Sequence, residues 1–251
     1  MTKGKLWQLL EDELAHWRAA GMRAQLWLRD DDAVRPSPAL DRLIGLAGQF
    51  DVPVALAIIP SRTGPDLARR LDRARHIHPV IHGWSHANHA PPSEKKQELG
   101  PHRARDIVLG ELSMGLARLS DLHGERLVPM LVPPWNRIDP SLLDDLPALG
   151  FAGLSAFGHK LASKPKLPVV NTHIDIIDSH AGNACRDHGM LVNSLVTELA
   201  QARALGGRAV GILSHHLVSD DDAFRFLREL FTAAAQSGVV RWRSPGEILT
   251  V

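Results

Sequence analysis

The sequence predicts a single parallel α/β domain, and its length favours a closed (β/α) barrel. Short apolar segments alternate with segments of helical periodicity along the chain, in about seven strand–helix units. No change in composition divides the 251 residues, so residues 1–251 are expected to form one domain. An open doubly wound sheet would produce the same alternation and is the alternative architecture.

The predicted strands are apolar runs that end in charged residues, polar residues or proline. Such runs are typical of strands that are buried on both faces of a parallel sheet. The first runs directly into Arg29, and the second stops at Pro60. In chain order, the predicted strands span residues 24–28, 52–59, 78–82, 127–132, 151–157, 167–177, 209–215 and 239–243.

The predicted helices carry apolar residues three and four positions apart, which places these side chains on one face. Ser37 and Pro38 are typical of a helix start, and Gly206 with Gly207 of a helix end. An amphipathic helix within residues 1–22 is expected to pack on the barrel. The other predicted helices span residues 39–49, 66–73, 104–123, 140–149, 190–205 and 220–236.

Charge and cysteine content argue against several classes of protein. Lys and Arg number 29 and Asp and Glu 28, for a formal net charge of +1, so attraction to nucleic acid or an anionic membrane is not expected. No apolar run reaches the roughly 20 residues that span a bilayer. The lone Cys185 excludes an internal disulfide and a multi-cysteine zinc site. Without a signal-peptide pattern, a cytoplasmic location is expected.

Polar residues gather where the predicted strands end. Because the carboxyl ends of parallel strands meet at one end of either architecture, the active site is expected there. The polar segments in chain order are RDDD (29–32), HGWSHANH (82–89), PPWNR (133–137), NTHID (171–175) and SHH (214–216).

Aspartate and histidine in these segments point to metal chemistry. Three adjacent aspartates repel one another unless a cation or arginine lies beside them, although a solvated loop would also tolerate them. His82 and His86 are four residues apart, so on a helical turn both could bind Zn²⁺, Co²⁺ or Fe²⁺ with an Asp as third ligand. A second Asp could take a proton from water, and a histidine could protonate the leaving group. His215 is expected to point into the barrel mouth and His216 away from it, unless both are ordinary loop histidines.

In this order, the RDDD, HGWSH, VPPWN and ILSHH segments resemble the motifs of the polysaccharide deacetylase superfamily, that is, carbohydrate esterase family 4 or NodB-like deacetylases. The resemblance extends over most of the chain and implies a distorted (β/α)7 barrel. It also implies that Asp31 is the catalytic base and His215 the acid. Zinc, or cobalt or another divalent transition metal, would be held by Asp32, His82 and His86. The register is ambiguous by one residue, so Asp30 and Asp31 are the alternative pair.

The sequence departs from the family pattern at three places. Gly83 replaces the usual Ser or Thr, and Val132 replaces an arginine that orients the base. Arg29 and Arg137 are the candidates to replace that arginine. The Asp that braces the catalytic histidine would be Asp175 or Asp178, without the usual Trp after it. The resemblance further implies that Trp135, Asn136 and Arg137 line the oxyanion or substrate site, and that Arg29, Asp175 and His173 support it.

The expected function is metal-dependent removal of an acetyl group, N-acetyl before O-acetyl, from a carbohydrate, oligosaccharide or sugar-like small molecule. Two alternatives stay open. One is a metal-independent amidohydrolase of cyclic amides or ureides, a class that the superfamily also contains. The other is a non-catalytic barrel that binds carbohydrate.

Overall fold

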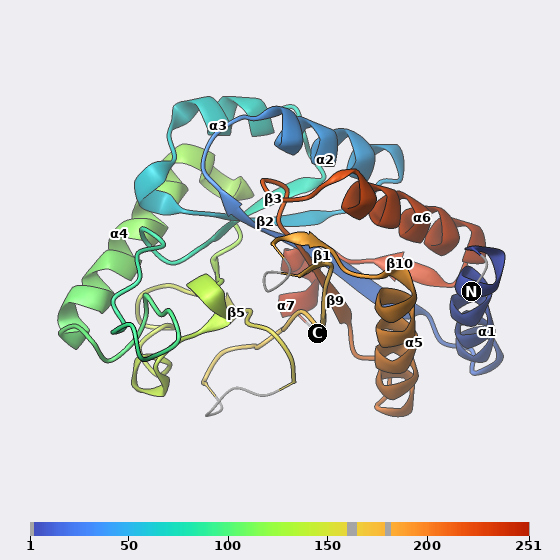
Figure 1. Cartoon of the computed structure of the whole chain (residues 1–251). Helices are drawn as coiled ribbons and strands as arrows, with labels where there is room; N and C mark the ends of the chain where they lie inside the picture. The colour runs from blue at the N-terminus through green and yellow to red at the C-terminus, as the bar shows by residue number, and fades with distance from the viewer. Residues whose placement is uncertain (1–2, 160–164, 179–181, 251) are drawn as a thin grey trace.

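Figure 1 shows the computed structural model, in which helices surround a curled sheet; it describes residues 3–159, 165–178 and 182–250. The strands follow the order β5-β4-β3-β2-β1-β9-β6, and β10 pairs with β1. All of these pairings are parallel. The strands of this sheet are β1 (Ala24–Ala33), β2 (Val54–Ile58), β3 (Ile77–Ile81), β4 (Met130–Leu131), β5 (Gly153–Leu154), β6 (Ile174–Asp175), β9 (Val210–Ser214) and β10 (Val240–Trp242).

The segment 169–172 links the two ends of the curled sheet. On one side, Thr172 donates its backbone N–H to the carbonyl of Ala156, just after β5. On the other side, His173 donates its backbone N–H to the carbonyl of Gly211 in β9. Seven strands, β1 to β6 and β9, therefore form a distorted (β/α)7 barrel, which confirms the predicted fold class.

Helices cover the outside of the sheet, and α1 lies beside α5 at one side of the molecule (Figure 1). The helix α6 illustrates why these elements form. Asp220 caps its first turn, Gly238 ends it in the left-handed conformation, and its apolar residues face the core. The helices are α1 (Lys3–Ala19), α2 (Pro38–Gln49), α3 (Pro65–Leu71), α4 (Arg105–His123), α5 (His188–Ala204), α6 (Asp221–Ser237) and α7 (Pro245–Leu249).

The strands predicted over residues 127–132 and 151–157 are shorter in the structure, as β4 and β5, and two other predicted elements differ in kind or continuity. The helix predicted over residues 140–149 is wrong, because only a 3₁₀ turn forms there, at Pro140–Leu142. Pro147 lies in that segment, and proline removes a helical hydrogen bond and clashes with the preceding turn. The strand predicted over residues 167–177 is interrupted, and its last residue belongs to β7 (Ile177–Asp178), which pairs antiparallel with β8 (Ala184–Cys185).

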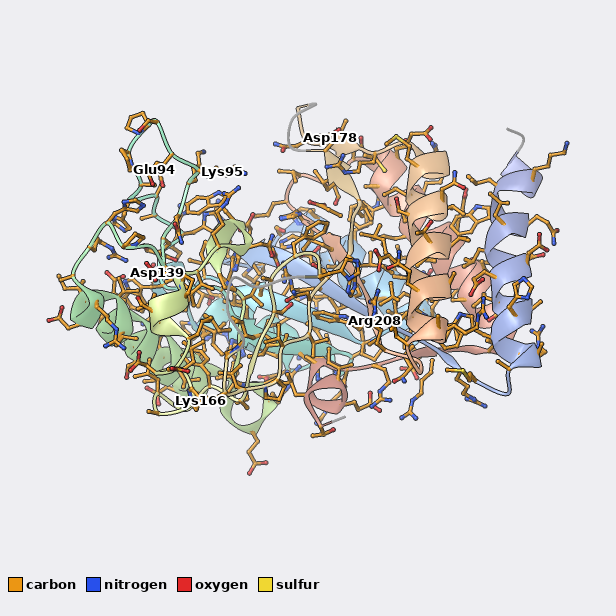
Figure 2. The ribbon with its side chains drawn as sticks, turned by 90° about the horizontal axis from the view of Figure 1, so that it is seen from below. Glu94, Lys95, Asp139, Lys166, Asp178 and Arg208 are labelled. Carbon is orange, nitrogen blue, oxygen red and sulfur yellow. The ribbon has the colours of Figure 1, made fainter. Side chains whose placement is uncertain are left out.

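The strand registers bring the polar segments to one end of the barrel. Asp30 lies opposite Ser214, and Ile81 lies opposite Leu131, so residues 31–32, 82–86, 132–137 and 215–216 all follow at that end. In Figure 2, the loop carrying Glu94 and Lys95 and the hairpin carrying Asp178 project from this end, and Lys166 lies toward the other. No helix in the part of the chain that the structure describes is both long and apolar enough to cross a membrane.

Candidate active site

The three consecutive aspartates of β1 face three different partners. The register between β1 and β2 shifts between Asp30 and Ala33, and Asp32 has a left-handed φ of 73°. In a regular strand, Asp30 and Asp32 would point to the same face. The bulge instead turns Asp30 toward the end of β9, Asp31 toward Arg29, and Asp32 toward two histidines.

Asp32, His82 and His86 form a group whose ligand atoms all lie within 4.8 Å of one another. The Nε2 atoms of His82 and His86 lie 3.1 and 3.2 Å from Asp32 Oδ1. His82 Nδ1 lies 2.9 Å from the carbonyl of Val132, to which it donates. The other ring nitrogen of His82 therefore faces the carboxylate, and this arrangement is favourable only with a proton or a cation between them.

The pKa shifts in this group favour the charged forms of His82 and Asp32 and the neutral form of His86. Burial opposes a charge on His82, but the hydrogen bond with Asp32 and the charges of Asp31 and Asp32 outweigh burial and raise its pKa above 6.5. Burial also opposes a charge on Asp32, yet the hydrogen bond with His82 and the nearby histidines hold its pKa well below 3.8. Burial and the charge of His82 lower the pKa of His86. Two imidazoles and one carboxylate are a donor set that suits zinc and related metals.

Arg29 is completely buried and binds Asp31 through two contacts. Its Nε lies 2.9 Å from Asp31 Oδ1, and its Nη2 lies 3.0 Å from Oδ2. Nη1 donates to Ser155, and Nη2 donates to Asn136 Oδ1 at 2.6 Å. Arg137 instead donates to the backbone carbonyl of Lys96. Arg29 is therefore the arginine that orients Asp31.

The turn after Pro133 and Pro134 lies beside the group of Asp32, His82 and His86, called here the metal-type group. Trp135 and Asn136 both have left-handed φ values, 54° and 59°, which are uncommon for residues other than glycine and often occur at functional sites. The ring centroids of Trp135 and His86 lie 4.2 Å apart. This turn thus connects the metal-type group, through Trp135, with the Arg29–Asp31 pair, through Asn136.

The two histidines that follow β9 have different surroundings. His216 is buried, and its Nδ1 and backbone N–H lie 2.5 and 2.9 Å from the carboxylate of Asp30. Burial opposes its charge, but Asp30 outweighs burial and raises the pKa of His216. His215 is half-buried and lies close enough to Asp32 and Asp175 for its charge to lower the pKa of both. His216 is thus held by Asp30, whereas His215 interacts electrostatically with Asp32 and Asp175.

Asp175 and His173 lie in different surroundings. Burial raises the pKa of the Asp175 carboxyl, against the opposing charge of His215. The prediction that His173 supports the site needs correction, because its ring accepts from the backbone N–H of Gly211 and lies 3.0 Å from Arg208 Nη1. His173 precedes β6 and bonds to Gly211 near the start of β9, whereas Asp175 pairs with Leu213 near the end of β9. His173 therefore lies farther from the active-site end of the barrel than Asp175 does. Figure 2 shows Arg208 away from the end where Asp178 projects.

Comparisons with known proteins agree on the architecture. No protein-family model and no curated protein sequence matches the chain. A Mycobacterium smegmatis structure assigned to the polysaccharide deacetylases matches with a TM-score of 0.69 and 18% identity, over 92% of this chain and 90% of that chain. The chain has the polysaccharide deacetylase fold.

Two further structures with the same fold are carbohydrate esterases of family 4. The Streptomyces lividans esterase in complex with acetate has a TM-score of 0.56 and 15% identity, over 86% of this chain and 90% of that chain. The Clostridium thermocellum acetyl xylan esterase in complex with a cobalt ion has a TM-score of 0.54 and 14% identity, over 90% of both chains. The resemblance drawn from the four sequence motifs is thus confirmed for the fold.

Within this deacetylase fold, Glu98 explains why Gly83 replaces the usual Ser or Thr. Glu98 is completely buried and accepts hydrogen bonds from the backbone N–H groups of Trp84 and Ser85, at 3.1 and 2.7 Å, and from Ser85 Oγ at 2.8 Å. Gly83 has a φ of 57°, and a Cβ there would lie 2.1 Å from Glu98 Oε2. Glu98 therefore occupies the space of a side chain at position 83 and holds the turn between His82 and His86. No motif in the sequence pointed to it.

We expect Glu98→Gln to weaken metal binding by about tenfold or more, the usual effect of disturbing groups that position metal ligands. The amide has one acceptor oxygen, so its NH₂ group would face an N–H donor of the turn. Titration with Zn²⁺ or Co²⁺ measures the change. Glu94→Gln, at an exposed position of the same loop, is the control and is expected to bind like the wild type. Equal affinities for both variants would contradict a role of Glu98 in holding the turn.

Proposed function

We propose that this protein is a metal-dependent hydrolase that removes an acetyl group from a carbohydrate or sugar-like molecule. The observation that carries the proposal is the position of Asp31, held by Arg29, next to the group of Asp32, His82 and His86 at the mouth of the barrel. The fold shared with polysaccharide deacetylases supports the reaction class. An acetyl ester or amide is the substrate class because one family 4 esterase of this fold was solved with acetate.

Asp32, His82 and His86 would hold the divalent metal, with zinc as the first candidate. The cobalt ion in the Clostridium thermocellum esterase supports a metal of this class. When bound, the metal would lower the pKa of water and polarise the acetyl carbonyl. The contact of His82 Nδ1 with Val132 fixes the ring so that Nε2 is the ligand atom.

Asp31 and His215 would carry the proton transfers. Asp31 takes a proton from the attacking water, and the two contacts with Arg29 hold its carboxylate in a fixed orientation. His215 donates a proton to the leaving amine or alcohol on the other side of the group. Trp135 and Asn136 line the space where the acetyl group would lie.

Acetate release from a panel of N-acetylated and O-acetylated sugars and oligosaccharides tests the proposal. Protein loaded with Zn²⁺ or Co²⁺ is expected to release acetate, with a new free amine in equal amount for N-acetyl substrates. Metal-free protein is expected to release none. Turnover of cyclic amides without metal would instead favour the amidohydrolase. Sugar binding without any release, by metal-loaded protein, would favour the non-catalytic barrel.

A further inference from the structure

A second group of metal-type side chains lies where β8 meets the first turns of α5 and α6. It consists of Cys185 at the end of β8, His188 at the start of α5 and Asp222 in the first turn of α6. Their thiol, imidazole and carboxylate ligand atoms all lie within 4.8 Å of one another. His188 Nε2 lies 3.3 Å from Asp222 Oδ1. Cys185 is the only cysteine in the chain.

The backbone and the core hold these three residues in place. Cys185 pairs with Ile177 in the β7–β8 hairpin. Its backbone N–H donates to Asp220 Oδ2, and Asp220 Oδ1 caps the first turn of α6. The edge of the His188 ring packs against Phe226, with ring centroids 5.2 Å apart. The group is therefore built from three elements that the fold brings together.

The electrostatic surroundings of Cys185 suit a cation better than a cysteine nucleophile. Burial and then the charge of Asp220 raise the pKa of the Cys185 thiol to about 11, so the thiol stays protonated and unreactive at neutral pH. The charge of Arg225 opposes this shift, and the charge of Asp187 adds to it. A bound metal would displace the thiol proton and supply the positive charge that these carboxylates favour.

Arginine side chains lie near the Cys185 group and also near a third group of possible metal ligands. Arg225 pairs with Asp222 Oδ1, but its side chain is 60% exposed and it contacts no other member of the group in the described contacts. In the third group, His159, His173 and Glu198, the guanidinium of Arg208 contacts both His173 and Glu198. The cation of that third group therefore contacts two of its members, whereas the described contact of Arg225 in the Cys185 group is with Asp222.

We propose that Cys185, His188 and Asp222 bind a second transition-metal ion, Zn²⁺ or a metal of similar softness. Thiolate, imidazole and carboxylate are three ligands that zinc accepts, and water would complete a tetrahedral site. The ion would join the β7–β8 hairpin to α5 and α6, and so has a structural role. This proposal is independent of the proposed hydrolase function.

Cobalt spectroscopy on the full chain tests this site, because only a thiolate ligand gives the thiolate-to-Co²⁺ charge-transfer absorption in the near ultraviolet. The wild type and His86→Ala are both expected to show the band. Cys185→Ser is expected to lose it, and His188→Ala and Asp222→Asn to bind this Co²⁺ at least tenfold more weakly. His16→Ala, at an exposed position on α1, is the control and is expected to keep the band unchanged.

Metal content by elemental analysis separates this site from the active site. We expect two metal ions per chain in the wild type and one in either Cys185→Ser or His86→Ala. Absence of the thiolate band at saturating Co²⁺ would overturn the second site, as would a band that His188→Ala and Asp222→Asn leave unchanged. Loss of a metal in His86→Ala only would leave the active-site proposal standing and reject this one.

Discussion

Asp31→Asn is expected to lower kcat for acetate release by about a hundredfold to ten-thousandfold, the usual contribution of a general base. Asparagine has nearly the shape of aspartate but cannot accept a proton from water. Because Asp32, and not Asp31, belongs to the ligand group, the variant is expected to keep its active-site metal. The measurements are kcat on the best substrate of the acetylated panel and metal content of the same sample.

The ion pair with Arg29 requires a stability control for this variant. Removing one partner of a buried ion pair commonly destabilises a protein by about 3–5 kcal/mol. The Asn side chain keeps one acceptor for Arg29, so the variant is expected to fold with a lower Tm. Activity is therefore compared well below that Tm. A variant that retains its metal and the wild-type kcat would exclude Asp31 as the base.

His86→Ala and Asp32→Asn are each expected to abolish metal binding at the active site, and acetate release with it. Each change removes one of only three protein ligands in the group. Elemental analysis in the Cys185→Ser background reports on this site alone, with one ion expected before the change and none after it. Retention of the ion in both variants would show that the metal binds elsewhere.

In the Cys185→Ser background, the affinity of the active site for metal is expected to rise with pH. The pKa of His82 in the folded protein is raised above 6.5, the value expected in the unfolded chain. Without metal, protonated His82 therefore stabilises the fold below pH 6.5, and this stabilisation is lost as pH rises through the raised pKa. The metal takes the place of that proton, so the increase in Tm on adding Zn²⁺ should grow between pH 6 and pH 8. A larger increase at the acidic end would contradict His82 as a ligand.

Local patterns in the sequence were sufficient to predict the fold class. The alternation of buried strands with amphipathic helices predicted a parallel α/β domain, because each period depends on side chains that are close in the chain. The order of the motifs pointed to the deacetylase fold, which the structure comparison confirms. Prediction failed at residues 140–149, where Pro147 removes a helical hydrogen bond and only a 3₁₀ turn forms.

The candidate site was only partly predictable. The spacing of His82 and His86 and the aspartates after the first strand indicated which residues meet. The sequence could not assign Asp30, Asp31 and Asp32 to their partners, because the bulge in β1 depends on its pairing with β2.

Only the tertiary structure decided the contacts between distant segments. Arg29 rather than Arg137 orients Asp31 because the Arg29 side chain is enclosed between β1, Ser155 and Asn136. Glu98 reaches Trp84 and Ser85 from a separate loop. Residues such as these leave no periodic pattern in the sequence. Spacing along the chain determines which elements form, whereas the packing of elements far apart in the chain determines which charged groups are buried together.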